Sequence, residues 1–280
     1  MPVSMFSLAH HAQNRLASSC VGRWLVVLLI ECAVLAVTSP AWAEAVGVRH
    51  QEGLVHGFLA IRTLDRKRIA DGEITQIADG DSIRSHLVFH FTDGSLYEEE
   101  ATFTQRGTFR LRTDHLVQKG PSFKRRLESF IDATSGRVKL RYTDDDGKEK
   151  SIDESMRLPE DLANGLLFTL LRHIDPGKPQ TIVPELALTP KPRLVTLVIT
   201  PRGEESFTTG HTRHQATHYV VKVKIGGIAG WFAGLLGKQP PDIHVWIMRG
   251  EAPAFIKFEG PVATGGPVWR VELADSARFG

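Results

Sequence analysis

Alternation of apolar and polar residues is the dominant pattern of the chain from Gly53 onward. In the stretch 83–91, Leu87 and Phe89 fall on one side of an extended strand, and Arg84 falls on the other. The segment Thr92–Ser95 follows directly and carries an Asp-Gly pair, which is typical of a hairpin turn. This pattern predicts antiparallel β-structure.

The same alternation recurs along the rest of the chain, with turn residues between the apolar stretches. In the stretch 108–119, we expect Phe109 and Leu111 on one side of the strand and Arg112 and Asp114 on the other. The Pro-rich segment Lys178–Arg193 is expected to be an extended connection, which is too short to separate two domains. The predicted strands are 83–91, 95–103, 108–119, 123–131, 137–143, 149–154, 194–200, 205–211, 217–225, 242–248, 255–259 and 268–273.

One segment follows the helical period instead. Pro159 suits the first turn of a helix, Asp175-Pro176-Gly177 suits its end, and Gly165 inside it would permit close packing. The apolar stripe of this helix consists of Leu162, Leu166, Leu167, Leu170, Leu171 and Ile174. The sequence therefore predicts a mainly β fold, in which a long antiparallel meander forms a curved half-barrel or a near-closed barrel. One amphipathic helix packs on its concave face.

The first 43 residues have the layout of a secretory signal peptide. Arg23 precedes the apolar run 24–37, and Ala41-Trp42-Ala43 provides an Ala-x-Ala cleavage pattern before Glu44. The alternatives are a retained membrane anchor and a lipidated Cys32. However, the run is shorter than the ~20 residues of a membrane-spanning helix. We expect residues 1–43 to be a cleaved signal peptide, and residues 44–280 to be a single β-rich domain that is periplasmic or secreted.

The composition narrows the chemistry of the exported part. The only cysteines of the chain, Cys20 and Cys32, lie in the leader, so residues 44–280 contain neither a disulfide nor a thiolate site. In the full chain, Lys and Arg number 34 against 32 Asp and Glu, which gives no indication of nucleic-acid binding. The lack of disulfides and of Asn-x-Ser/Thr acceptor sites favours a bacterial envelope.

Catalytic and metal-binding motifs are weak in this sequence. Three histidines close in sequence, His211, His214 and His218, are candidate metal ligands. However, His214 and His218 would lie about 13 Å apart on one strand face. The acidic run 144–147 fits a hairpin better than a calcium loop. Histidines on a polar strand face and a turn explain these residues, so we predict no metal ligand and no cofactor.

The only candidate for nucleophilic catalysis is a pair at the rim of the sheet. Lys119 and Ser122 flank a Gly-Pro break, where a Ser-Lys dyad could form. The chain has no Gly-x-Ser-x-Gly nucleophile elbow. We therefore predict no catalytic residue, and the enzyme hypothesis stays open only if a polar cluster occupies a cleft.

The segment Ile225–Gly237 is apolar and contains five glycines. We predict that it is a gate over one mouth of the half-barrel, with Trp231 and Phe232 as its apolar cover. The alternatives are a buried connector, in which the glycines allow tight packing, and a loop that contacts lipid.

Several phrases of the sequence resemble a bacterial periplasmic family of unknown activity. They are Asp114–Phe123, Gly237–Asp242, Leu158-Pro159 before the helix, and the late stretches Val245–Met248 and Pro253–Lys257. The likeness covers residues 53–273. The architecture that it implies is similar to the LolA/LolB lipoprotein-carrier fold, a half-barrel whose concavity holds acyl chains under a helix.

The functional hypothesis follows from this architecture. We expect a non-catalytic periplasmic binding protein for a lipid or lipoprotein-like apolar ligand. The candidate lining residues are Phe89, Phe109, Leu166, Leu170, Trp231 and Phe232. The alternative is a structural or envelope-assembly factor that binds a protein partner through a sheet edge or the apolar loop. Neither hypothesis involves nucleic acid, nor a transmembrane span once the leader is cleaved.

Overall fold

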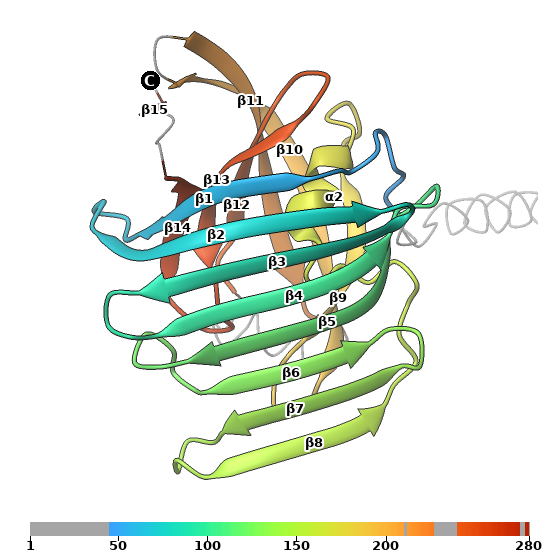
Figure 1. Ribbon diagram of the computed structural model, residues 1–280, viewed down its shortest axis with the longest axis vertical. Helices are drawn as coiled ribbons and strands as arrows, with labels where there is room; N and C mark the ends of the chain where they lie inside the picture. The colour runs from blue at the N-terminus through green and yellow to red at the C-terminus, as the bar shows by residue number, and fades with distance from the viewer. Residues whose placement is uncertain (1–44, 210–211, 227–239, 275–277, 280) are drawn as a thin grey trace, which may run out of the picture. The chain divides into compact units, whose positions relative to one another are not determined.

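The computed structural model describes residues 45–209, 212–226, 240–274 and 278–279. Eight strands come first in the described chain, and Figure 1 shows them stacked side by side. They are β1 (Val55–Arg62), β2 (Arg68–Asp79), β3 (Ser82–Phe91), β4 (Leu96–Thr104), β5 (Arg110–Lys119), β6 (Leu127–Asp132), β7 (Arg137–Thr143) and β8 (Glu149–Ser155).

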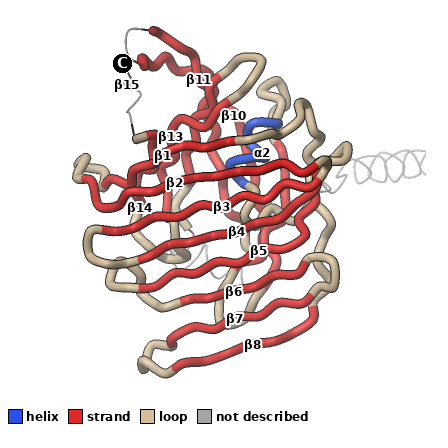
Figure 2. Tube along the Cα trace, viewed as in Figure 1, coloured by secondary structure: helices blue, strands red, loops and turns tan. Residues whose placement is uncertain are grey.

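The second half of the domain contains the helix and the remaining strands. These elements are α2 (Leu167–His173), β9 (Thr181–Ala187), β10 (Arg193–Thr209), β11 (Thr212–Lys224), β12 (Ile243–Met248), β13 (Ala254–Pro261), β14 (Val268–Leu273) and β15 (Arg278–Phe279). Strand dominates the described chain, as Figure 2 shows. The expectation of a mainly β fold with one helix is therefore confirmed for the described residues.

All of these strands belong to one antiparallel sheet. Its order is β15-β10-β11-β12-β13-β14-β1-β2-β3-β4-β5-β6-β7-β8, and β9 pairs with β10 beside this path. Pairing of β1 with β14, which places Leu59 opposite Leu273, joins the beginning of the described chain to its end. No strand pairing among the described residues joins β8 to the opposite end, so the meander forms an open, curved sheet.

The helix fills the concave side of this sheet. Leu166, Leu170 and Leu171 are each at most 3 % exposed and share one core cluster with residues from both halves of the sheet, such as Phe103 and Val245. In Figure 1, α2 lies behind β1, β2 and β3. The apolar stripe that the sequence indicates is therefore buried against the sheet. No described helix is both long and apolar enough to cross a membrane.

Several expectations about element boundaries are wrong: β1 and β2 are not among the expected strands, and β6 and β11 begin at Leu127 and Thr212 instead of 123 and 217. Three further differences have a clear physical reason. The helix has seven residues and begins after Leu166, because Gly165 adopts a φ of +66° that no helix contains. The stretch 194–200 and the described part of the stretch 205–211, which ends at Thr209, form one strand, β10, with a register shift between Pro201 and Gly203. The Pro-rich segment is extended as expected, but it contains strand β9, where Pro184 is tolerated because β9 pairs with β10 alone among the described strands.

Candidate ligand-binding cavity

A cavity of about 170 Å³ lies between α2 and the sheet. Three strands from the first half of the chain, β2, β3 and β4, contribute to its wall. Strands β9, β12, β13 and β14 from the second half contribute as well. Its lining residues are Ile74, Ser85, Leu87, Phe89, Tyr97, Glu99, Ala101, Ala163, Gly165, Leu167, Phe168, Thr169, Glu185, Ile243, Phe258, Pro261, Val262 and Val271. Most of these side chains are apolar, so the wall suits an apolar molecule.

Of the six residues expected to line the cavity, the structure places only some at its wall or beside it. Phe89 lines the cavity. Leu166 and Leu170 are buried in the core beside it, while the neighbouring helix residues Leu167 and Phe168 form the wall. Phe109 packs away from the cavity, with its ring 4.6 Å from that of His173. Trp231 and Phe232 lie outside the described residues, as does most of the expected gate at 225–237.

Phe89 has room at the wall because the facing residue lacks a side chain. Gly72 on β2 is its Cα partner, and a Cβ atom added at Gly72 would overlap the Phe89 ring. An aromatic ring laid over a cross-strand glycine covers backbone that would otherwise be exposed to the cavity. Gly72 and Phe89 together therefore shape this part of the wall.

A β-bulge turns Asp114 towards the interior. Thr102 and Phe103 of β4 pair with Thr113 and Leu111 of β5, which leaves Arg112 without a partner in β4. One extra residue shifts the alternation of the strand by one position. As a result, Asp114 is only 1 % exposed, whereas simple alternation places it on the outer face.

Three carboxyl groups gather at the cavity. Glu99 on β4 and Glu185 on β9 are half-buried lining residues, and Asp114 lies next to them. A Cβ atom at Gly165 would lie 2.9 Å from Asp114 Oδ1 and 2.7 Å from Ala101 Cβ, and Gly165 and Ala101 are both wall residues. Asp114 is therefore directly behind the cavity wall.

The surroundings of these carboxyls oppose ionisation. Burial raises the pKa of Glu99 to about 7, although the hydrogen bond that it accepts from Tyr97 (3.2 Å) acts to lower it. Burial and the negative charge of Glu99 raise the pKa of Glu185 to about 7. Burial, with the charges of Glu99 and Glu185, raises the pKa of Asp114 well above its usual value. Among the residues that the structure describes, neither carboxyl oxygen of Asp114 has a hydrogen-bond partner.

Sequence reasoning missed this acidic group for identifiable reasons. Glu99 belongs to the run 98–100, which reads as solvated, although alternation with Tyr97 and Ala101 points it inward. Glu185 lies in the Pro-rich segment, where no strand was expected. The inward orientation of Asp114 depends on the β-bulge, and no residue in the sequence of β5 indicates a bulge there.

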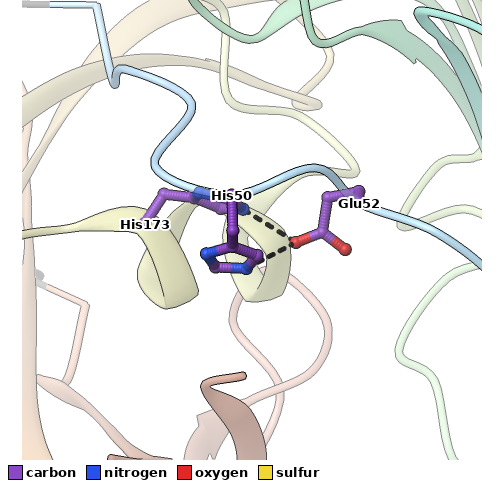
Figure 3. A group of neighbouring side chains, drawn as sticks. All are labelled: His50, Glu52 and His173. Carbon is purple, nitrogen blue, oxygen red and sulfur yellow. Dashed lines mark hydrogen bonds and ion pairs between the residues drawn. The ribbon is translucent and has the colours of Figure 1, made fainter. Parts of the chain in front are cut away.

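A second polar group joins the segment before β1 to the end of α2. His50, Glu52 and His173 offer ligand atoms that all lie within 4.8 Å of one another. The rings of His50 and His173 stack with their centroids 3.9 Å apart, and both face Glu52 (Figure 3). His173 Nε2 lies 2.7 Å from Glu52 Oε1. These residues are far apart in the sequence, so no spacing indicates the group.

The other residues around Glu52 stabilise its ionised form. Its second carboxyl oxygen accepts hydrogen bonds from Arg172 (2.6 Å) and from Gln76 (2.7 Å). Burial alone would raise the pKa of Glu52, but the hydrogen bond from His173 and the charge of Arg172 outweigh burial and lower it. Burial also lowers the pKa of His50. Glu52 is thus a buried carboxylate whose charge is compensated.

This second group fits a structural network better than a metal site. His173 Nδ1 accepts a hydrogen bond from the backbone N–H of Arg49 (3.1 Å). The neutral imidazole therefore carries its proton on Nε2, where it donates to Glu52. A metal on Nε2 would require the proton on Nδ1, donating to an acceptor, and Nδ1 faces a donor instead.

The remaining candidate residues of the sequence do not come together. The Ser122 hydroxyl donates to Asp93 (2.7 Å) at the hairpin turn and does not bond Lys119. His214 stacks on Phe207, whereas His218 contacts His244 and Glu205; His211 lies outside the described residues.

The acidic run at 144–147 forms the turn between β7 and β8. Asp144 Oδ1 accepts backbone N–H groups of Asp146 and Lys148, as expected of a hairpin. These local hydrogen bonds occupy the first carboxylate of the run, and they account for its position in the chain.

The fold and the cavity define a β-rich, open half-barrel with a cavity between α2 and the sheet. Among solved structures, the chain is similar to a beta-barrel-like protein of domain of unknown function DUF1849 from Brucella abortus. The TM-score is 0.45 and the sequence identity 9 %, over 82 % of this chain and 100 % of that one. No family model matches the chain, and no curated protein does.

Proposed function

We propose that the protein is a non-catalytic binding protein, which takes the apolar part of a lipid or of a similar small molecule into the cavity beside α2. The observation that supports this proposal is the cavity itself, which is lined mainly by apolar side chains from both halves of the sheet. The predicted leader supports a periplasmic or extracellular site for this activity.

The size of the cavity limits the ligand. Its volume of about 170 Å³ is below the roughly 300–1,000 Å³ of pockets that enclose drug-sized ligands. The half-barrel is largely filled by its own core, since residues from both halves of the sheet and α2 share one buried cluster. The ligand is therefore a small molecule, or a larger lipid of which one end enters the protein.

The alternative, a factor that binds a protein partner through a sheet edge, has weaker support. Six of the seven residues of the edge strand β8 are exposed, and four of the seven are charged. Charged side chains on an edge strand oppose the addition of another strand. One of these charged residues, Asp153, is paired with Arg137 of the neighbouring strand β7 (2.8 Å).

Filling the cavity tests the proposal. Val262 lines the cavity, so Val262→Trp should occupy the space that a ligand needs. Val88→Trp is the matched control, because Val88 lies on the opposite face of β3 from the cavity residues Leu87 and Phe89. Native mass spectrometry after mild purification should detect bound lipid on the wild type and on Val88→Trp, and much less on Val262→Trp. Equal occupancy of all three proteins would show that the ligand binds elsewhere.

A further inference from the structure

The cavity combines an apolar wall with an excess of acid. Glu99 and Glu185 line it from two strands, β4 and β9, that belong to opposite halves of the sheet. Asp114 lies behind the wall at Gly165 and is 1 % exposed. A charged residue is seldom buried without a partner, because its desolvation costs several kcal/mol.

Among the described residues, few hydrogen-bond donors and no cationic lining residues stabilise the ionised forms of these carboxyls. None of the described residues that line the cavity is Lys, Arg or His. Within the described parts of the chain, the Tyr97 hydroxyl is the one side-chain donor to Glu99, and both oxygens of Asp114 are buried without a partner. The buried carboxylate Glu52 is the internal contrast, since Arg172, His173 and Gln76 surround it. The acidic group of the cavity therefore lacks donors that the same fold provides elsewhere.

A metal ion does not fit this arrangement. Within the part of the chain that the structure describes, only His50, Glu52 and His173 bring three ligand atoms within 4.8 Å of one another. The oxygens of Glu99, Asp114 and Glu185 are further apart, whereas Ca²⁺ and Mg²⁺ hold their ligands at ~2.0–2.6 Å. The bulkier ammonium group has three donors that reach separate acceptors.

We propose that the ligand of this cavity is a cationic amphiphile, whose protonated amine is held by Glu99 and Glu185 while its apolar part contacts the wall around Phe89. This inference rests on the proposed binding function and specifies its ligand class. Asp114 adds a third acceptor behind Gly165. The amine supplies the donors that the wall lacks, and a lipid without a cationic group leaves the acids unpaired.

Binding of an amine has a second consequence, which can be measured separately. The pKa values of Glu99 and Glu185 are raised to about 7 by burial, so both groups are partly protonated at neutral pH. A bound ammonium group favours their ionised forms. Binding should therefore release protons, and the calorimetric enthalpy should depend on the ionisation enthalpy of the buffer.

The test compares three probes that share one chain: octylamine, 1-octanol and octanoate. Isothermal titration calorimetry at pH 7 should give an affinity for octylamine about tenfold above that for 1-octanol, as expected for one charge-assisted hydrogen bond. Octanoate should bind most weakly, because its carboxylate is repelled. Octylamine binding should also release protons.

Two isosteric variants and one control assign the effect to the cavity. Glu99→Gln and Glu185→Gln should each weaken octylamine binding about tenfold and weaken 1-octanol binding much less, since 1-octanol carries no charge for the acids to pair with. Both variants remove a poorly solvated acid, so folding should not suffer. Glu100→Gln, on the exposed face of β4, should change neither affinity.

The outcomes separate this inference from the proposed function. If 1-octanol binds the wild type as tightly as octylamine, or if both Gln variants retain octylamine affinity, the cationic ligand is wrong and apolar binding stands. If none of the three probes binds the wild type, the proposed function fails together with the inference.

Discussion

Gly165 controls how closely the segment before α2 approaches the sheet. Its φ of +66° lies in the left-handed region, which costs other residues ~1–2 kcal/mol. A side chain here would also meet Ala101 Cβ at 2.7 Å and Asp114 Oδ1 at 2.9 Å. Backbone conformation and packing therefore both require glycine at this position.

Replacement of Gly165 by Ala should destabilise the protein by about 2–4 kcal/mol, the sum of the backbone cost and of overpacking. Gly147→Ala is the matched control, because Gly147 also has a positive φ (+77°) but has no atom within 4 Å of an added Cβ. Urea denaturation of both variants measures the difference. Equal losses for the two variants would mean that the contact with Ala101 and Asp114 is not tight.

The segment before β1 is held against α2 by one buried carboxylate. Glu52 accepts hydrogen bonds from Arg172 and His173, and its backbone N–H donates to the Gln105 side chain (2.7 Å). Arg49 extends the contact, because its guanidinium donates to the carbonyl of Ile174 at the end of the helix (3.3 Å). This network fixes the position of α2, and thereby one wall of the cavity.

Loss of the Glu52 charge should lower the free energy of unfolding substantially. Glu52→Gln leaves Arg172 buried without a carboxylate, and breaking a buried pair in this way costs about 3–5 kcal/mol. The control is Glu73→Gln, since Glu73 forms an exposed pair with His56 (2.8 Å), and such pairs contribute at most about 1 kcal/mol. Thermal and urea unfolding should show a large loss for Glu52→Gln only. A small loss for Glu52→Gln would show that solvent or another donor compensates Arg172.

Strands with regular alternation were predictable from the sequence, whereas deviations from regularity were not. The stretches 137–143 and 268–273 match β7 and β14 residue for residue, because each has clear alternation and a turn at its end. The buried apolar stripe is confirmed, but α2 is shorter than the stripe predicts, because Gly165 has a positive φ and the helix begins after it. The bulge at Arg112 and the strand inside the Pro-rich segment arise from pairing with distant strands, which local patterns do not contain.

The candidate site was less predictable than the fold. Phe89 was expected at the cavity on the basis of its strand face, and the structure places it there. The carboxyls of Glu99, Asp114 and Glu185 come from three strands far apart in the sequence, and only the assembled sheet brings them together. Their polar character suggests exposure when each is considered alone.

The pH dependence of stability should reflect the carboxyls of the cavity. The pKa values of Glu99 and Glu185 are raised from 4.5 to about 7 by burial, so the folded chain holds more protons than the unfolded chain between these values. The free energy of unfolding should therefore fall as the pH rises from 4.5 to 7, by at most about 1.4 kcal/mol per pH unit for each group. Glu52, whose pKa is lowered, has the opposite sign, and its contribution is lost as the pH falls below 4.5.

The variant Glu185→Gln isolates this effect. Burial lowers the pKa values of His50 and His218, so these groups favour the folded state as the pH rises and oppose the trend of the carboxyls. Their contribution is common to both proteins. The difference in unfolding free energy between Glu185→Gln and the wild type should therefore grow from pH 5 to pH 7. A constant difference would mean that Glu185 ionises normally in the folded protein.

The central claim is that an apolar molecule binds inside the half-barrel beside α2, and not on its surface. The most direct measurement is a set of intermolecular nuclear Overhauser effects between 1-octanol and the methyl-labelled protein. The account predicts effects to the methyl groups of Leu87 and Val271, which line the cavity. Effects confined to the exposed residues Leu54, Leu64 and Ile77, or none at all, would contradict it.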